Sequence, residues 1–349
     1  MVIKIGKHTL GLGHPTFIVA EMSGNHGGSL DRAIEIVRAA KRAGADAIKL
    51  QTYTANTITL NCDFDDFSLP SESPWADSVS LWDLYDKAHT PWEWHEEIFI
   101  EARKLSLEVF SSPFDETAVD FLENLNVPAY KIASPEITHI PLLKRVAITG
   151  KPVIVSTGVA DLADIELALD TLRESGAKDI ILLKCTSTYP APPEESNLIT
   201  IRDMASRFEV LSGLSDHTVG TATALASVAL GGCFIEKHFN LEDNKETVDS
   251  FFSSGELEFS SMVNDIRLVE KSLGKTSYEI TESAHSSLRG RRSLYVSAPI
   301  KAGELFTQLN VKSVRPSFGL HPKHYDEIIG RSAKCDLEMG DRLSWDVIE

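Results

Sequence analysis

Eight short runs of β-branched and other apolar residues alternate, along the first 270 or so residues, with longer stretches in which apolar positions recur every three or four residues. The short runs have the length and composition of buried strands, and the longer stretches have the period of amphipathic helices. Glycines follow several of the longer stretches, where helices are expected to end. The predicted strands cover residues 17–22, 47–52, 107–112, 129–134, 152–157, 179–186, 209–216 and 233–239.

Helical periodicity is clearest in five of the intervening stretches. Eight repeats of strand and helix predict a (β/α)8 barrel, a TIM barrel, which typically needs about 250 residues. A doubly wound open sheet is the competing architecture. We favour the barrel over residues 1–273, because the polar residues of the predicted strands fall near the strand ends, which a barrel gathers around one mouth. The helical stretches are residues 29–44, 118–125, 163–176, 221–232 and 256–273.

Three segments depart from this alternation. Residues 53–89 form a long Pro- and Ser-rich stretch between two predicted strands, and long loops inside a compact domain are usually functional. Residues 274–290 are polar and predict a linker. Residues 291–349 contain short apolar runs separated by glycine and proline turns, with little helical periodicity. They predict a second, small β-rich domain, marginal in size but long enough to fold.

Composition narrows the function classes. The chain has 349 residues with 34 Lys and Arg against 51 Asp and Glu, a formal net charge of −17. No basic patch is evident, so we expect no nucleic-acid partner. No run approaches 18 apolar residues and the N-terminus shows no signal peptide, so we expect no membrane contact and a cytoplasmic location. The four widely spaced cysteines form no disulfide framework and indicate a reducing compartment.

Two histidines are candidate metal ligands. His217 and His238 end the seventh and eighth predicted strands, which are neighbours in a barrel, so their imidazoles can reach a common divalent ion. Glu236 lies on the same strand face as His238 and is able to bind that ion or its water. Two histidines are an incomplete ligand set, which suits an exchangeable Mn²⁺, Mg²⁺ or Co²⁺ better than structural zinc. The alternative is that both are ordinary polar residues at strand ends.

Lysines and serines at the same mouth indicate an anion site. Lys49 and Lys131 interrupt apolar strand runs, where a lysine needs an anionic partner. A carboxylate such as Glu21 or Glu136 provides one explanation, and a substrate anion provides the other. Two cations with several hydroxyl donors suit a phosphorylated acid. Glu21 and Glu136 are either general acids or bases, or neutralise the lysines. The serines at equivalent strand ends are Ser112, Ser134, Ser156, Ser187 and Ser215.

An ordered set of motifs resembles a known family. AEMSGNHGGS, IKLQTYT, FSSPFD, YKIASPEI, VSTG, KCTSTYP, GLSDHTVG and IEKHF are similar to the motifs of the sialic acid synthase family, in the same order and over nearly the whole chain. The resemblance implies a TIM barrel followed by an antifreeze-protein-like (SAF) domain. Within that family, residues 81–95, 184–190 and 314–325 look most like pseudaminic acid synthases, whereas N-acetylneuraminate synthases usually have Asn at the position of Ser187.

The resemblance also implies a reaction. It is the metal-dependent condensation of phosphoenolpyruvate with the open-chain aldehyde of 2,4-diacetamido-2,4,6-trideoxy-altrose, which gives a nonulosonic acid and releases phosphate by C–O cleavage. The enzyme would be a transferase and a homodimer in which each small domain covers the partner's barrel. The implied metal ligands are His217 and His238, with Mn²⁺ as the first choice and Mg²⁺ or Co²⁺ as alternatives.

Substrate contacts follow from the same resemblance, motif by motif. Arg315 of the partner subunit would contact a substrate acyl group, and Glu136 would lie near C2 of the enolpyruvate. Lys49, Ser112 and Lys131 would hold the carboxylate of phosphoenolpyruvate. Its phosphate would contact Ser134, Ser156, Ser187 and Ser215. The sugar would face Glu21, Gln51, Tyr189 and Asp249.

Other functions stay open at this point. The first is an N-acetylneuraminate or legionaminic acid synthase, and the second is an aldolase that forms a Schiff base through Lys131. The third is a non-catalytic sugar-binding or ice-binding protein. Two lysines, two histidines and two carboxylates at one mouth are hard to reconcile with the third.

Overall fold

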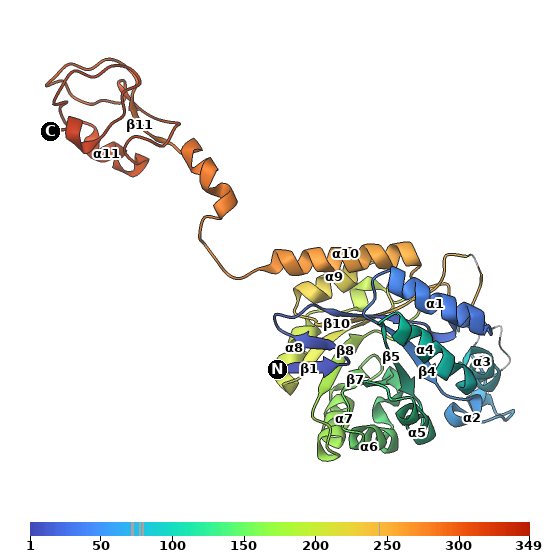
Figure 1. The fold of residues 1–349 in the computed structure, drawn as a ribbon. Coiled ribbons are helices and arrows are strands. Elements are labelled where there is room, and N and C mark those ends of the chain that lie inside the picture. The colour runs from blue at the N-terminus through green and yellow to red at the C-terminus, as the bar shows by residue number, and fades with distance from the viewer. Residues whose placement is uncertain (71–72, 77, 79, 244) are drawn as a thin grey trace. The chain divides into compact units, whose positions relative to one another are not determined.

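The computed structural model describes residues 1–70, 73–76, 78, 80–243 and 245–349. It divides into two compact units, Met1–Gly274 and Lys275–Glu349 (Figure 1). In this described part of the chain, no helix combines the length and apolar character needed to cross a membrane.

The first unit is a closed barrel of eight parallel strands, in the order β10-β3-β4-β5-β6-β7-β8-β9. The predicted (β/α)8 barrel is therefore confirmed, and each predicted strand matches an observed strand to within two residues at either end. The strands are β3 (Phe17–Glu21), β4 (Ala47–Thr52), β5 (Glu108–Pro113), β6 (Tyr130–Ile132), β7 (Val153–Ser156), β8 (Ile180–Cys185), β9 (Leu211–Asp216) and β10 (Phe234–His238).

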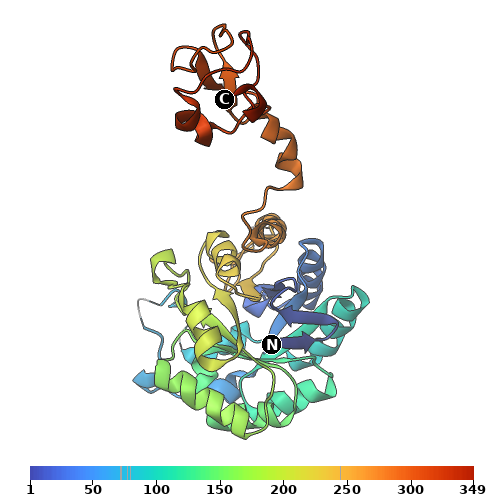
Figure 2. The ribbon, with the colours of Figure 1, turned by 90° about the vertical axis from the view of Figure 1, so that its left-hand side faces the viewer.

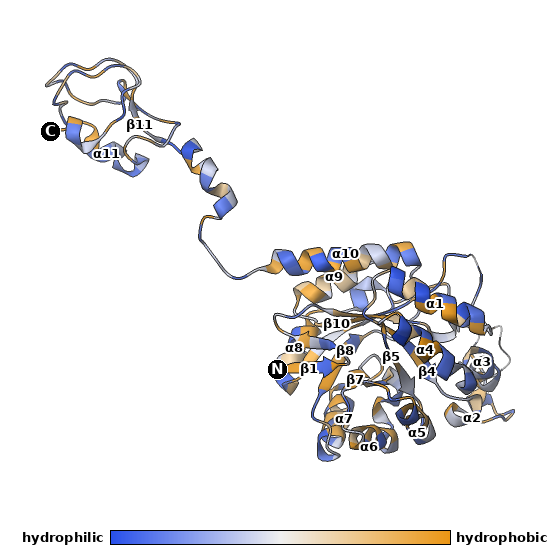
Figure 3. Ribbon diagram, viewed as in Figure 1, coloured by the Kyte–Doolittle hydropathy of each residue, from blue (hydrophilic) through white to orange (hydrophobic). Residues whose placement is uncertain are grey.

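Amphipathic helices surround the barrel (Figure 2), and Figure 3 shows both hydrophobic and hydrophilic residues along them. In the first of them, Ile34, Val37 and Ala40 recur at helical spacing and are buried, and Ser29 caps the helix by accepting a hydrogen bond from the Arg32 N–H at 3.3 Å. The helices are α1 (Leu30–Arg42), α4 (His95–Lys104), α5 (Glu116–Asn124), α6 (Ile140–Ile148), α7 (Leu162–Glu174), α8 (Thr200–Phe208), α9 (Ala222–Ala229) and α10 (Glu256–Leu273).

An N-terminal hairpin was not predicted from the sequence. Strands β1 (Val2–Ile5) and β2 (His8–Gly11) pair antiparallel and add their alternating apolar residues to the barrel core. His8 packs edge-on against Phe17, the first residue of β3, at 5.1 Å between ring centres. The hairpin therefore lies at the amino ends of the strands. Four-residue strands provide only two alternations each, which is too few to predict from pattern alone.

The segment 53–89 is less irregular than its composition indicated. It contains α2 (Ala55–Ile58), the 3-10 turn η2 (Asp65–Phe67) and α3 (Leu81–Ala88). Residues 71, 72, 77 and 79 of this segment lie outside the described residues. Helix α3 begins after Ser80, whose side chain accepts from the Asp83 N–H at 3.1 Å, a local N-cap that composition alone did not reveal. The other 3-10 turns of this unit are η1 (Ser23–His26), η3 (Trp92–Trp94), η4 (Ser134–Thr138) and η5 (Pro193–Glu195).

The second unit has its own apolar core, which includes Leu294, Ile300, Phe306 and Ile328. It contains one small antiparallel sheet and several isolated bridges, as expected for a small β-rich domain. A 3-10 helix, η6, occupies part of the polar segment for which a linker was predicted. The elements are η6 (Glu282–Gly290), β11 (Ser293–Val296), β12 (Val311–Val314), η7 (Pro322–His324), α11 (Tyr325–Ile328) and η8 (Trp345–Val347).

Candidate active site

Strand register brings polar side chains together at the carboxyl ends of the barrel strands. Glu21 is the Cα partner of His238 on one side and of Lys49 on the other, so polar groups of three adjacent strands lie side by side. Because side chains alternate along a strand, Gln51 shares the inward face with Lys49, and Glu236 shares it with His238. One cavity, here called the mouth cavity, is lined by Glu21, Lys49, Gln51, Ser112, Lys131, Ala133, Ser134, Pro135, Ser156, Cys185, Tyr189, Ser215, His217, Glu236 and His238.

Two buried ion pairs cross this cavity. Lys49 pairs with Glu21 and donates to Ser112 Oγ at 3.1 Å, and Lys131 Nζ lies 2.8 Å from Glu236 Oε1. The two pairs are linked, because Lys49 Nζ also lies 3.9 Å from the same Glu236 oxygen. The sequence offered Glu21 or Glu136 as the partner of these lysines. Glu21 does pair with Lys49, whereas Lys131 pairs with Glu236.

The two glutamates titrate differently. Burial raises the pKa of the Glu21 carboxyl, and the attraction of Lys49 only partly opposes this. Burial also acts on Glu236, but the charges of Lys131 and Lys49 outweigh it and lower the pKa of that carboxyl. Glu236 is therefore ionised, while Glu21 takes up a proton more readily than an ordinary glutamate. Two ammonium groups with one firmly ionised carboxylate leave the cavity suited to an anionic ligand.

The two histidines are close enough to share one metal ion. Their ring centres are 5.4 Å apart, and two imidazoles that bind one ion at about 2.1 Å have centres within roughly 6 Å of each other. His217 Nδ1 donates to the Thr186 carbonyl at 2.9 Å, so Nε2 is the nitrogen that could bind a metal ion. His238 Nδ1 is buried without a hydrogen-bond partner in the described residues. Burial lowers the pKa of His238 well below its usual range, so this imidazole is neutral and has a free lone pair.

These residues fit a divalent ion with exchangeable ligands. Among the described residues, no group of three or more His, Cys, Asp or Glu side chains is placed to hold a metal. Two imidazole nitrogens would leave the remaining positions to water and substrate, as in catalytic rather than structural metal sites.

Cys185 was missed as a site residue. It ends β8 in register with Ser215, and its Sγ lies 3.8 Å from His217 Nδ1. Burial by itself would raise the pKa of the thiol, but the charge of His217 lowers it to about 6. Burial by itself would lower the pKa of the His217 imidazole. The charge of Cys185 and its contact with the ring outweigh the effect of burial, so the pKa of His217 is raised. The sequence could have indicated this role, because Cys185 lies near the end of a predicted strand, where the other site residues also lie.

The serines line one side of the mouth cavity. Ser134 Oγ accepts from the Gly158 N–H at 2.9 Å, and Ser156 Oγ is buried without a partner in the described part of the chain. Ser187 lies just outside the lining, with its Oγ 3.8 Å from Cys185 Sγ. A Cβ atom on Gly158 would collide with Ser187 Oγ and crowd Ser134 Oγ. Glycine at this position therefore keeps a hydroxyl-lined space open.

Two carboxylates stand at the edge of the cavity. Glu136 lies in η4, directly after β6, and its Oε2 is buried without a partner in the described residues. Burial raises the pKa of Glu136 to about 7. Asp249 is buried on the loop after β10, where it accepts from the Ser23 hydroxyl and lies 4.0 Å from His238 Nδ1. Burial raises the pKa of Asp249 as well.

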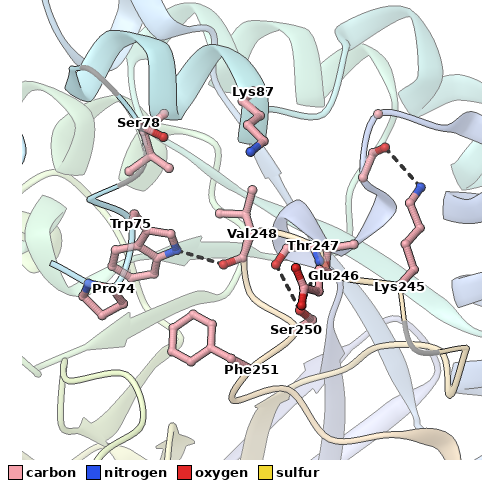
Figure 4. A pocket seen from close by; sticks show the side chains of 13 residues that line it. Pro74, Trp75, Ser78, Lys87, Lys245, Glu246, Thr247, Val248, Ser250 and Phe251 are labelled. Atoms are coloured by element: carbon pink, nitrogen blue, oxygen red, sulfur yellow. Dashed lines mark hydrogen bonds between the residues drawn. The ribbon is translucent and has the colours of Figure 1, made fainter.

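Aromatic rings pack against the histidine pair. Tyr189 is 4.4 Å from His217 and Phe252 is 4.6 Å from His238, measured between ring centres. Trp75 packs against Tyr189 at 5.6 Å and donates from Nε1 to the Val248 carbonyl at 2.8 Å. Trp75 and Val248 also line a separate cleft of about 630 Å³ (Figure 4). Phe252 and Trp75 were not predicted as site residues, because contact with the mouth depends on how their loops fold.

Arg315 belongs to the second unit. It is exposed and lines a cleft of about 570 Å³ that also contains Arg291, Arg292 and His321. The mouth cavity thus gathers eleven of the fifteen predicted site residues, and Glu136, Ser187 and Asp249 stand at its edge.

The barrel and its polar mouth define a (β/α)8 enzyme. The model of the NeuB family matches residues 36–278, and the model of the SAF domain matches residues 291–349. The chain belongs to the NeuB family, and it is therefore a phosphoenolpyruvate-dependent nonulosonic acid synthase that uses an amino-sugar substrate. Synthases of this family generally depend on a divalent metal ion. The resemblance noted in the sequence motifs is confirmed.

Similar proteins cover almost the full chain. A pseudaminic acid synthase of Campylobacter jejuni (strain 81-176) is 45% identical over 94% of this chain and 95% of that protein. An N,N'-diacetyllegionaminic acid synthase of Campylobacter jejuni (strain NCTC 11168) is 36% identical over 91% and 96%, respectively. The crystal structure of a spore coat polysaccharide biosynthesis protein from Bacillus subtilis superimposes with a TM-score of 0.68 at 34% identity, covering 100% of this chain and 99% of that one.

Proposed function

We propose that this chain is a pseudaminic acid synthase. It would condense phosphoenolpyruvate with the open-chain aldehyde of 2,4-diacetamido-2,4,6-trideoxy-altrose and release phosphate by C–O cleavage. The observation that carries the reaction is the convergence of Lys49, Lys131, His217 and His238 on one buried cavity. The choice of sugar is supported by 45% identity to a pseudaminic acid synthase, against 36% to a legionaminic acid synthase.

In this proposal, phosphoenolpyruvate binds along the lysine and serine side of the mouth cavity. Lys49, Lys131 and Ser112 hold its carboxylate, which would share the ammonium groups with Glu21 and Glu236. The phosphate contacts the hydroxyl groups of Ser134, Ser156, Ser187 and Ser215. The unpartnered Ser156 Oγ and the space beside Gly158 support this assignment, because a phosphate oxygen would accept the missing hydrogen bond.

The sugar binds beside it, against Glu21, Gln51, Tyr189 and Asp249. Gln51 donates to Glu21 Oε1 at 3.0 Å, which fixes the orientation of that carboxylate. His217 and His238 would hold a divalent ion, Mn²⁺ as the first choice, which when bound supplies Lewis-acid polarisation of the aldehyde oxygen. Holding both substrates in one cavity places C3 of the enol against the aldehyde carbon, and such proximity can contribute several orders of magnitude in rate.

Glu136 would complete the reaction at C2. When C3 attacks the aldehyde, positive charge develops at C2, and the neighbouring carboxylates stabilise it. Glu136, with its pKa raised to about 7, is suited to accept a proton from the water that adds at C2. Loss of phosphate with C–O cleavage then leaves the 2-keto acid. In ¹⁸O-labelled water, the released phosphate is expected to stay unlabelled; label in phosphate and not in the keto acid would contradict this step.

A homodimer with exchanged small domains would complete the site through Arg315 of the partner subunit. Charge distribution supports this arrangement: residues 1–274 have 23 Lys and Arg against 41 Asp and Glu, whereas residues 275–349 have 11 against 10. Mixing His217→Ala with Arg315→Ala protein would test it. With random exchange of subunits, about half of the dimers are heterodimers, and one of the two sites in each heterodimer is intact. The mixture is therefore expected to regain up to about a quarter of wild-type activity. No restoration would argue against the exchange.

The decisive test compares acceptor sugars. The purified chain is assayed with phosphoenolpyruvate and Mn²⁺ against the diacetamido-trideoxy-altrose, the legionaminic acid precursor and N-acetylmannosamine. Highest kcat/KM with the first sugar supports the proposal, and a preference for either other sugar would favour the corresponding synthase. A Schiff-base aldolase through Lys131 is less well supported, because Lys131 is ion-paired with Glu236; trapping with borohydride would reveal it. Phosphoenolpyruvate-independent sugar binding without turnover would favour a binding protein.

A further inference from the structure

A buried ion pair lies directly behind the two histidines. Lys237 precedes His238 in β10, Asp216 precedes His217 at the end of β9, and the lysine and the aspartate are Cα partners in the parallel register. They alternate with the inward-facing residues, so their side chains lie on the outer side of the barrel wall. Lys237 Nζ is 2.8 Å from Asp216 Oδ2, and both side chains are fully buried.

The ammonium group of Lys237 holds both neighbours of His217. Besides the Asp216 carboxylate, it donates to the Thr218 carbonyl at 2.6 Å. Asp216 Oδ1 accepts from the backbone N–H and the hydroxyl of Thr218 at 3.0 and 2.8 Å, and Oδ2 accepts from the Thr223 hydroxyl at 3.0 Å. The residues on each side of His217 are therefore tied to the residue that precedes His238.

Stability is a weak explanation for this pair. Moving an ammonium and a carboxylate out of water costs several kcal/mol for each ion, and apolar residues of similar size often give equal or greater stability. The two strand ends that Lys237 joins are the ones that place the imidazoles, whose ring centres are 5.4 Å apart. The bond from His217 Nδ1 to the Thr186 carbonyl sets the ring orientation and does not connect the two strand ends.

We propose that Lys237 is a positioning residue for the metal site, which holds His217 at the distance from His238 at which both imidazoles bind one divalent ion. The inference rests on the metal-dependent function proposed above. It predicts that metal affinity depends on a side chain that does not contact the metal. In other metal sites, removing a group that orients a metal ligand weakens metal binding by about 10- to 100-fold.

The test is a titration of the full-length chain with Mn²⁺, in which free Mn²⁺ is followed by electron paramagnetic resonance. Lys237→Met is expected to raise the Kd for Mn²⁺ by about tenfold or more. The matched control is Arg267→Met, which removes the ion pair of Arg267 with Asp46 at the amino ends of the strands, 3.0 Å in the structure. This control is expected to lower Tm while leaving the Kd for Mn²⁺ unchanged.

Thr223→Val provides a milder variant, which removes the hydroxyl that donates to Asp216 and hydrogen-bonds with the Thr218 hydroxyl at 2.6 Å. It is expected to raise the Kd for Mn²⁺ several-fold, and it keeps the inference testable should Lys237→Met fail to fold. A variant with lowered Tm and wild-type Mn²⁺ affinity would assign Lys237 a purely structural role and overturn the inference. Wild-type protein that bound no Mn²⁺ would instead overturn the proposed metal site, and the positioning role with it.

Discussion

Glu21 and Lys49 stand opposite each other on adjacent strands and form an ion pair that is buried inside the barrel mouth. The pair is shared, because Lys49 also lies 3.9 Å from Glu236, which binds Lys131. Buried ammonium and carboxylate groups persist only when each has a partner. The four side chains therefore form one interdependent group, and a change in any of them alters the charge balance that an incoming anion meets.

Removal of one member should destabilise the fold more than removal of a matched pair. Lys49→Met leaves Glu21 buried without its partner, so we expect the free energy of unfolding to fall by about 3–5 kcal/mol. Adding Glu21→Gln should recover most of this loss, while the affinity for phosphoenolpyruvate stays low in both variants. Urea unfolding and ligand titration measure the two effects. Lys87→Met, at an exposed position on α3, is the control. A double variant as unstable as the single one would show that the ion pair is not the cause.

Glu136 should make stability depend on pH. Its pKa is about 7 in the folded protein against an ordinary value of 4.5, so the folded protein retains a proton that the unfolded chain has lost. Unfolding then releases a proton, and the free energy of unfolding should fall by about 3 kcal/mol as the pH rises from 4.5 to 7. Glu136→Gln should remove this component of the slope.

The same ionisation should appear in the kinetics. If Glu136 accepts the proton of the attacking water, kcat should rise with pH through about 7 in the wild type. The Glu136→Gln variant should have a low kcat without that limb. Unchanged pH profiles of stability and of kcat in the variant would exclude both roles of this carboxyl group.

The space beside Gly158 should be needed for the phosphate. Gly158→Ala places a methyl group against the hydroxyls of Ser187 and Ser134. We expect the KM for phosphoenolpyruvate to rise by roughly tenfold, equivalent to about 1.4 kcal/mol, with a smaller effect on the KM for the sugar. Gly290→Ala meets no atom within 4 Å and serves as the control in steady-state assays. Equal increases in both KM values would point to a general distortion of the mouth.

Loss of one imidazole should abolish the metal response. His217→Ala is expected to lower kcat/KM by roughly a thousand-fold, about 4 kcal/mol. Activity of the wild type should fall on chelation and return with Mn²⁺, whereas the variant should respond to neither treatment. His285→Ala removes an exposed histidine of the second unit and should behave as the wild type. Full activity of chelated His217→Ala protein would eliminate the metal from the mechanism.

Much of the fold and site follows from local pattern. Buried strands and amphipathic helices differ in period, and period is a property of contiguous residues, so the alternation predicted all eight barrel strands. The N-terminal hairpin was missed because its four-residue strands are too short to establish a period. Helix α3 was missed because it lies in the Pro- and Ser-rich segment 53–89, which was interpreted from its composition. Parallel strands in a barrel end at one mouth, which is why residues as distant as Lys49 and His238 were correctly expected to line one cavity.

By itself, the sequence determined the succession of strands and helices, the family and the chemical types present at the strand ends. Only the tertiary structure decided which of these groups meet. It paired Lys131 with Glu236 and Lys237 with Asp216, and it set Cys185 beside His217. The reason is that contacts between strands depend on strand register and on the path of the loops, and both are determined by residues far apart in the chain. Periodicity, in contrast, is a property of each segment alone.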